Sequence, residues 1–154
     1  ERQMLDETVA HVTPERYWQG LFQLASVGGI TSDFGTRRSY NGGAYNSYHG
    51  GVDFSANNGP AIRAPAAGKI VLAQPLHVRG NTTIIDHGLG VHSVLLHQAE
   101  ILVSVGEVVT LGQHIGRIGA TGLVTGPHLH WEILLGGIKV DPLQWTQSPI
   151  PSKR

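Results

Sequence analysis

Two short stretches of this chain hold residue types that bind metal ions. They are HGGVD at residues 49–53 and GPHLHWE at residues 126–132. Neutral imidazoles and carboxylates are suitable ligands for zinc, whose catalytic sites combine three protein ligands with one position open to water. His49, Asp53 and one of the two later histidines supply that number. The helical motif HExxH is absent, which excludes the commonest zinc protease architecture.

The backbone of each stretch predicts how these side chains are positioned. Two adjacent glycines in the first stretch oppose a helix, so we expect His49 in a bend that leads into a strand over residues 52–55. In the second stretch, an offset of two residues places both histidines on one face of a strand, with the leucine and the tryptophan on the other. Glu132 shares the histidine face, where its carboxylate could tune a histidine or could simply end the strand.

Glycine and proline divide the rest of the chain into short segments. The 154 residues include 21 glycines and 8 prolines, and from residue 28 onward the glycines leave no room for helices longer than two turns. Short β-branched or alternating segments fit strands instead. The expected strands are 69–73, 82–86, 91–96, 114–118 and 128–135, with two more turning at glycine within 105–113. We therefore predict an all-β fold of the small sandwich or barrel type.

We divide the chain into one domain and two flanking segments. Residues 1–28 lack the dense glycine punctuation, and TPERYW at 13–18 has the pattern of a helix N-cap followed by proline at the first helical position. This pattern predicts one short helix within an N-terminal arm that packs on the body. The domain is expected over residues 29–147, followed by a frayed tail over 148–154.

Composition excludes several classes of protein. Lys and Arg number 11, as do Asp and Glu, so no net charge attracts nucleic acid or anionic lipid. No apolar run approaches the ~18 residues of a membrane-spanning helix, and the first residues show no signal peptide. Because cysteine is absent, any metal must be held by histidine and carboxylate groups. The sequence leaves the oligomeric state open.

The combined motifs resemble the lysostaphin-type zinc metallopeptidases, which cut peptide cross-bridges of bacterial peptidoglycan. Besides the two stretches above, the resemblance includes SDFG at 32–35, APAAG at 64–68, DHG at 86–88, GQHIG at 112–116 and TG at 121–122. It implies an antiparallel barrel-sandwich-like β fold with zinc at the floor of a groove. The zinc ligands that it implies are His49, Asp53 and His130, and the histidines that it implies to be catalytic are His97 and His128.

The resemblance also implies a reaction and a location. The substrates would be stem or bridge peptides of peptidoglycan, met outside the cytoplasm: extracellularly, at the cell surface or in the periplasm. Zinc lowers the pKa of bound water toward roughly 7 and polarises the scissile carbonyl, while an unligated imidazole moves the proton to the leaving amine. His97 and His128 suit that second role. No covalent nucleophile is needed, in agreement with a chain that lacks cysteine.

Candidate substrate-binding residues precede the first metal-binding stretch. Arg37 and Arg38 could hold a substrate carboxylate through bidentate contacts, although paired arginines are also common in solvated loops. One of three nearby tyrosines, for instance Tyr45, could donate a hydrogen bond to the developing oxyanion. The alternative is that these tyrosines line an exposed loop.

Two other functions compete with the peptidase. A catalytically inactive relative of the same fold could bind the wall or activate another hydrolase, but such relatives typically lack ligands, and here all five motif positions are filled. A lipoyl or biotinyl carrier would need an exposed lysine between small or methionine neighbours, and neither Lys69 nor Lys139 has that context. The other aromatic and histidine residues are interpreted as core, structural or exposed: His11, His77, His87, His92, His114, Trp131 and Trp145.

Overall fold

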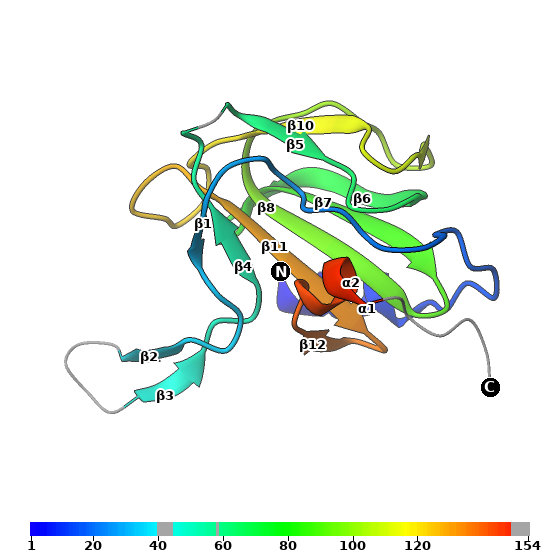
Figure 1. Cartoon of the computed structure of the whole chain (residues 1–154), viewed down its shortest axis with the longest axis horizontal. Helices are drawn as coiled ribbons and strands as arrows, with labels where there is room; N and C mark the ends of the chain where they lie inside the picture. Colours follow the sequence, from blue (N-terminus) through cyan, green and yellow to red (C-terminus); the bar gives the residue numbers. More distant parts are fainter. Residues whose placement is uncertain (40–44, 58, 149–154) are drawn as a thin grey trace.

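The computed structural model describes residues 1–39, 45–57 and 59–148, except the side chains of 38, 39 and 45–47. Its helices are α1 (Arg2–Ala10) and α2 (Gln144–Gln147). Its strands are β1 (Ile30–Ser32), β2 (Arg37–Ser39), β3 (Tyr45–Tyr48), β4 (Val52–Phe54), β5 (Ala61–Arg63), β6 (Gly68–Leu76), β7 (Gly80–Gly88), β8 (Val91–Ile101), β9 (Val108–Val109), β10 (His114–Ile118), β11 (Leu129–Leu135) and β12 (Ile138–Val140) (Figure 1). The described strand pairs are antiparallel, and the all-β prediction is confirmed.

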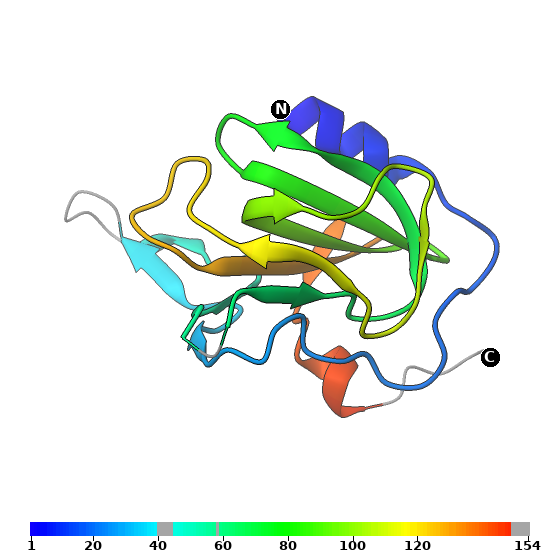
Figure 2. The ribbon, with the colours of Figure 1, turned by 90° about the horizontal axis from the view of Figure 1, so that it is seen from above.

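One curved sheet carries most of the strands, in the order β1-β4-β11-β8-β7-β6-β9. The end of β8 also pairs with β10, which in turn pairs with β5, so these two strands lie across one end of the main sheet (Figures 1 and 2). Strands β2 and β3 form a separate hairpin that projects from the body (Figure 1). Because β4, β11 and β8 each have ladder partners on both sides, they provide a fixed floor for a site.

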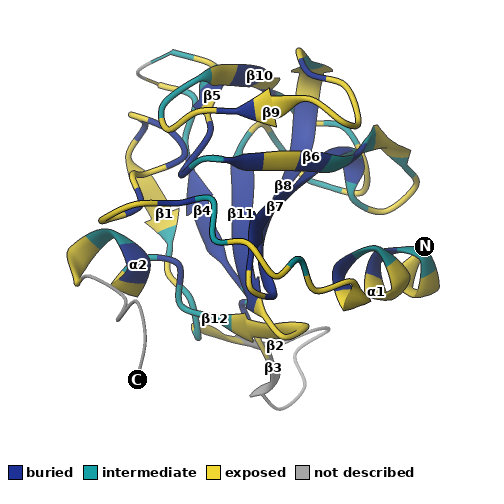
Figure 3. Cartoon of the chain, turned by 90° about the vertical axis from the view of Figure 1, so that its right-hand side faces the viewer, coloured by how far each residue is buried: buried dark blue, intermediate teal, exposed yellow. Residues whose placement is uncertain are grey.

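The interior consists of two apolar clusters on opposite faces of the central strands. The larger cluster draws side chains from the sheet, from β5 and β10, from the N-terminal segment and from α2. The smaller cluster lies under α1, whose Leu5 and Val9, four residues apart, share the buried face of the helix. With both faces covered, β7, β8 and β11 are buried along most of their length (Figure 3). The prediction that Trp131 and Trp145 pack in the core is confirmed.

The predicted strands outside 105–113 agree with the structure within about three residues, except that β8 continues to Ile101, five residues beyond the predicted end at 96. The prediction of two strands within 105–113 is wrong, because only the two-residue β9 forms there. Backbone hydrogen bonds close two tight turns on either side of it, from Glu107 N–H to Ser104 O (3.0 Å) and from Gln113 N–H to Thr110 O (3.1 Å). These turns take up the residues that a longer hairpin would need.

The prediction of one short N-terminal helix is confirmed, but its position at 13–18 is wrong, since the helix is α1 and residues 13–18 are irregular. The Thr13 hydroxyl, expected as a cap, donates instead to the carboxylate of Asp86. The Tyr17 N–H donates to the His87 carbonyl at 2.9 Å, so the segment is paired with the end of β7. Tertiary pairing here overrides a local capping pattern.

The division into residues 1–28, 29–147 and 148–154 stays a prediction. Within the described part of the chain, neither helix has the length and apolar character needed to cross a bilayer.

Candidate metal centre

The two stretches singled out by their residue types meet at one point on the sheet. Strands β4 and β11 are neighbours, and their register places Asp53 directly opposite His130. His49 lies outside the strands, between β3 and a bend at Gly51 that leads into β4, in agreement with the prediction from the adjacent glycines. A Cβ at Gly51 would lie 2.3 Å from the Trp131 carbonyl oxygen, so only glycine lets this bend approach β11 so closely.

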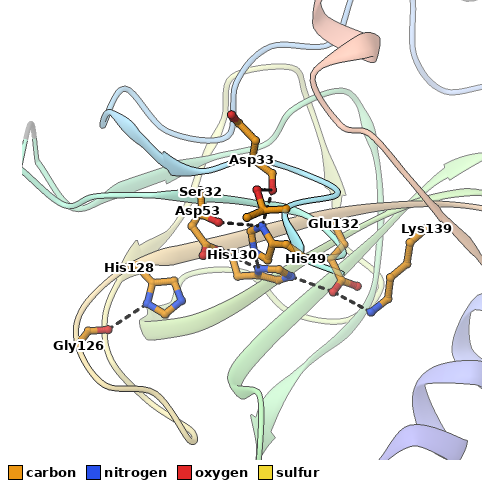
Figure 4. Close-up of polar contacts among 10 residues, drawn as sticks. Ser32, Asp33, His49, Asp53, Gly126, His128, His130, Glu132 and Lys139 are labelled. Carbon is orange, nitrogen blue, oxygen red and sulfur yellow. Dashed lines mark hydrogen bonds and ion pairs between the residues drawn. The ribbon is translucent and has the colours of Figure 1, made fainter. Parts of the chain in front are cut away.

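Three side-chain atoms of this cluster converge (Figure 4). His49 Nε2 lies 3.1 Å from Asp53 Oδ1 and 3.2 Å from His130 Nδ1, and His130 Nδ1 lies 2.8 Å from the same carboxylate oxygen. These residues form the one group in the described part of the chain whose ligand atoms lie close enough together to share a metal ion. His128, the other candidate of the pair, is not in that group.

The outer nitrogens of both imidazoles are held by acceptors (Figure 4). His49 Nδ1 lies 2.9 Å from the Asp33 carbonyl oxygen, and His130 Nε2 lies 2.9 Å from Glu132 Oε2. Since a carbonyl or a carboxylate can only accept, these nitrogens carry the N–H, and in each neutral ring the lone pair then lies on the nitrogen that faces Asp53. Two neutral imidazoles and one carboxylate arranged in this way fit zinc.

The electrostatics of the cluster favour a positive charge at its centre. Burial opposes ionisation of the Asp53 carboxyl, but its contacts with His130 and His49 outweigh burial and lower its pKa well below the usual range. Burial likewise opposes a charged His130, but hydrogen bonds to Asp53 and Glu132 raise its pKa to about 9. The carboxylates therefore stabilise a cation between them, which either a proton on His130 or a divalent metal supplies.

Two further histidines stand beside the cluster. The ring centroids of His97 and His128 are 4.9 Å apart, and that of His97 is 6.5 Å from that of His130. The Nδ1 atoms of His97 and His128 lie 2.9 Å from the Thr121 carbonyl and 3.0 Å from the Gly126 carbonyl, so each N–H points there and each Nε2 is left as an acceptor. Burial lowers the pKa of His97 and keeps this imidazole neutral near neutral pH.

An irregularity in β8 presents His97. Opposite β7, Leu95 pairs with Thr83 whereas Gln98 pairs with Asn81, so β8 accommodates one extra residue as a β-bulge. The φ angle of His97 is +64°, a left-handed conformation that residues with a side chain rarely adopt. Strained backbone of this kind is concentrated at functional sites. No local pattern of glycine or proline in the sequence signals this bulge.

A groove of about 540 Å³ runs over the cluster. Its lining includes the five histidine and aspartate residues above, together with side chains that the sequence analysis did not assign to the site: Val78, Arg79, Leu96, Leu123, Val124, Thr125 and Lys139. Most of these come from turns and from β12, and only the fold brings them to the groove.

The predicted substrate-binding residues lie on the projecting hairpin. Arg37 is exposed, and its guanidinium carbon stands 5.3 Å from the centre of the Tyr48 ring, which itself lines the groove. Arg37 is not among the described lining residues. The side chains of Arg38 and Tyr45 lie outside the described part of the structure. A role for these residues therefore stays a prediction.

Known sequences that are similar to this chain include peptidases. The sequence profile of Peptidase family M23 matches residues 47–142. The peptidoglycan DD-endopeptidases ShyB and ShyA of Vibrio cholerae are 35% and 36% identical to this chain over 115 residues, which is 75% of this chain and 27% of each relative. The DD-carboxypeptidase/endopeptidase Mpg of Neisseria gonorrhoeae is 37% identical over 62% of this chain and 22% of its own length. The chain thus spans about a quarter of the length of these relatives.

Solved structures agree with the sequences. A zinc-containing peptidase from Vibrio cholerae superimposes with a TM-score of 0.76 at 30% identity, covering 87% of this chain and 41% of that one. The catalytic domain of lysostaphin from Staphylococcus simulans gives a TM-score of 0.67 at 31% identity, covering 79% of this chain and 93% of that domain. The predicted resemblance and the antiparallel β fold are confirmed.

Proposed function

This chain belongs to peptidase family M23, and on that premise we propose that it is a zinc-dependent endopeptidase that hydrolyses peptide cross-links of bacterial peptidoglycan. The observation that carries the proposal is the convergence of His49 Nε2, Asp53 Oδ1 and His130 Nδ1, with the outer nitrogen of each imidazole held by an acceptor. We assign His49, Asp53 and His130 as the zinc ligands. Zinc bound there would polarise the scissile carbonyl and make a water molecule acidic enough to attack near neutral pH.

The remaining residues of the site move protons and fix the ligands. His97 Nε2 and His128 Nε2 are acceptors beside the ligand cluster, so they can take the proton of the attacking water and return it to the leaving amine. The neutral state of His97 at pH 7 is the state that this role requires. Glu132 holds the ring of His130 in orientation, and the Asp33 carbonyl does the same for His49.

The names of the relatives support the substrate and the location. Relatives named peptidoglycan DD-endopeptidases act on a polymer of the cell wall, and one further relative, from Haemophilus influenzae, is named an outer membrane antigenic lipoprotein. We propose that this chain likewise acts on peptidoglycan peptides outside the cytoplasm, in the periplasm or at the cell surface.

Digestion of purified sacculi tests the proposal. The zinc-loaded chain is incubated with sacculi of two cross-link types, one with glycine bridges and one with direct D-alanine–diaminopimelate links, and the new amino termini are identified. We expect release with zinc, and loss of release with a chelator or in His49→Ala. Full activity in the chelated sample would contradict the metal mechanism. Absence of release from either wall type, with zinc bound in a 1:1 ratio, would favour a wall-binding or hydrolase-activating module instead.

A further inference from the structure

Gln98 is a buried amide that directly follows His97 and has no part in the proposed chemistry. Its side chain is 0% exposed in β8, and a Cβ at Gly116 on β10 would overlap its Oε1, so a glycine leaves the space that the amide occupies. This Oε1 has no hydrogen-bond partner within the described part of the chain. Because an unpaired buried oxygen lowers stability, the reason for an amide at this position lies in its N–H groups.

The side-chain amide of Gln98 closes the bulge in β8. Its Nε2 donates to the Leu95 carbonyl at 3.1 Å and to the Thr83 hydroxyl oxygen at 2.8 Å. Leu95 and Gln98 are the residues whose pairing with β7 brackets the extra residue, so this one side chain spans the bulge. If the amide were turned over, its oxygen would face the Leu95 carbonyl, which cannot donate, so the orientation of the amide follows from its partners.

The backbone of Gln98 holds the loop that orients the His97 ring. Its carbonyl accepts the Thr121 hydroxyl at 2.7 Å and a side-chain N–H of Asn81 at 2.9 Å. The carbonyl of the same Thr121 accepts the Nδ1–H of His97, which leaves His97 Nε2 as the acceptor. The position of the Gln98 carbonyl depends on the bulge that precedes it. The side chain of Gln98 therefore fixes the His97 backbone directly and the His97 ring through Thr121.

We propose that Gln98 is a positioning residue for His97. Its N–H groups stabilise the bulge in which His97 has a φ of +64°, a conformation that residues with a side chain rarely adopt. An imidazole that is already fixed, with Nε2 as the acceptor, needs no reorganisation before it takes a proton. Without the amide, the bulge relaxes and the ring samples both tautomers. The consequence for catalysis rests on the proposed function, in which His97 moves the proton.

Gln98→Met tests the role of the amide in catalysis. Methionine removes both N–H donors and keeps an unbranched side chain of similar length. On a soluble cross-linked peptide we expect kcat to fall about tenfold and KM to change less than about twofold, since a displaced His97 weakens proton transfer but not substrate binding. Zinc should stay bound in a 1:1 ratio. An unchanged kcat would overturn the positioning role, and so would a loss that lies in KM alone.

Thr83→Val tests the same contact from its other side and serves even if Gln98→Met does not fold. Valine has nearly the shape of threonine but offers no oxygen to Gln98 Nε2. We expect kcat to fall about threefold in Thr83→Val, and Thr83→Val to have no further effect once Gln98→Met is present, because both changes act through one hydrogen bond. Losses that multiply fully in the double variant would overturn the role of this contact.

Ser93→Ala is the matched control, because it removes a buried donor from the same strand without contact to the bulge. The Ser93 hydroxyl joins His87 to the indole N–H of Trp131. We expect the urea midpoint to fall in Ser93→Ala and kcat to stay unchanged under conditions in which the variant is folded. An equal fall of kcat in Ser93→Ala and Gln98→Met would overturn the proposal, since it would show a general effect of lost stability.

Side-chain nitrogen NMR tests the geometry without turnover. In the zinc-loaded chain with ¹⁵N-labelled histidine, long-range ¹H–¹⁵N correlations distinguish the Nδ1–H and Nε2–H tautomers. We expect the Nδ1–H form alone for His97 in the wild type and a mixture in Gln98→Met, with the His87 signals unchanged. Identical His97 signals in the two proteins would overturn the positioning role. If the wild type cleaves no peptide, the endopeptidase proposal fails, whereas this comparison still decides whether Gln98 fixes the His97 ring.

Discussion

Histidine and carboxylate residues gather in two places on the same sheet, and of these two described clusters only one can hold a metal ion. The groove cluster has Asp53 and His130 on β4 and β11, whereas a second cluster has Asp86, His87 and His92 near the ends of β7 and β8 where these strands join. His87 and His92 are 0% and 1% exposed. Only the groove cluster has ligand atoms that converge, among the residues that the structure describes.

The second cluster shows why histidine content by itself does not make a metal site. Both nitrogens of His87 are engaged: Nδ1 donates to the Ala67 carbonyl at 2.8 Å, and Nε2 accepts from the Ser93 hydroxyl at 2.8 Å. The Ser93 oxygen in turn accepts the Trp131 indole N–H at 3.2 Å. No ring nitrogen of His87 is left with a free lone pair. In the groove cluster, by contrast, the outer nitrogens are engaged and the inner ones face each other, which is the arrangement that a cation requires.

Removal of a proposed zinc ligand should have the largest effect on activity. It should also show most clearly that only the groove cluster holds the metal. In His130→Ala, we expect the activity on sacculi to fall by at least about 10³-fold, because the metal contributes several kcal/mol of transition-state stabilisation. Zinc content by atomic absorption should fall with it, while the folded state persists by circular dichroism. A His130→Ala variant that keeps zinc and activity would contradict the ligand assignment.

Removal of a proposed proton carrier should have the next largest effect. In His128→Ala, we expect kcat to fall by about 10²-fold, the lower range for general acid–base catalysis, with zinc bound in a 1:1 ratio as in the wild type. Steady-state kinetics and the zinc content, both measured in the wild type and the variant, check this expectation. Loss of zinc together with kcat would instead make His128 a ligand.

The buried cluster of Asp86, His87 and His92 should affect the free energy of unfolding rather than catalysis. Burial lowers the pKa of His87 to about 4 in the folded chain, so between pH 6.5 and 4 the unfolded state takes up a proton that the folded state does not. The contribution of His87 is therefore present above pH 6.5 and is lost as the pH falls. Between pH 7 and 4.5 we expect this to lower the free energy of unfolding by about 2 kcal/mol.

Urea denaturation of chelated wild type and chelated His87→Gln at these two pH values measures the contribution, because other titrating groups cancel in the difference. If the free energy of unfolding had the same pH dependence in the two proteins, the lowered pKa of the buried His87 would be contradicted. Zinc stoichiometry, measured separately on the loaded proteins, should be unchanged in His87→Gln, which is the expected contrast with His130→Ala.

The smallest effect is expected from the residue that holds the ring of a proposed ligand. In Glu132→Gln, we expect zinc affinity to fall by about tenfold, the lower range for a residue that orients a ligand, because an amide accepts the His130 N–H more weakly than a carboxylate. Competition with a chelator of known affinity measures this. An unchanged affinity would show that the contact of Glu132 with His130 does not support the metal.

The strands were predictable because the physics that forms them is local. Alternating or β-branched segments between glycines predicted bounds close to the observed ones for β6, β7, β10 and β11 and for the start of β8. The helix was misplaced because the TPERYW pattern is only a preference, and the pairing of Tyr17 with His87 across 70 positions of the chain outweighed it. Such long-range pairing leaves no mark in a short window of sequence.

The site was predictable in its residue types and only partly in its assembly. The two-residue spacing placed His128 and His130 on one face of a strand, but it could not by itself indicate which of them is the metal ligand. The choice depends on the register of β11 against β4, which sets His130 opposite Asp53. The bulge that presents His97 and the hydrogen bond from Thr121 to Gln98 both depend on segments that are distant in sequence.

The sequence alone determined the all-β class, the exclusion of cysteine chemistry and the two stretches from which a cation could be held, because glycine punctuation and donor chemistry are properties of single residues and short windows. The tertiary structure alone decided which imidazole nitrogens face each other, which histidines are fully buried and which basic side chains line the groove. These depend on strand register and on closed turns, where a shift of one residue turns every side chain to the opposite face.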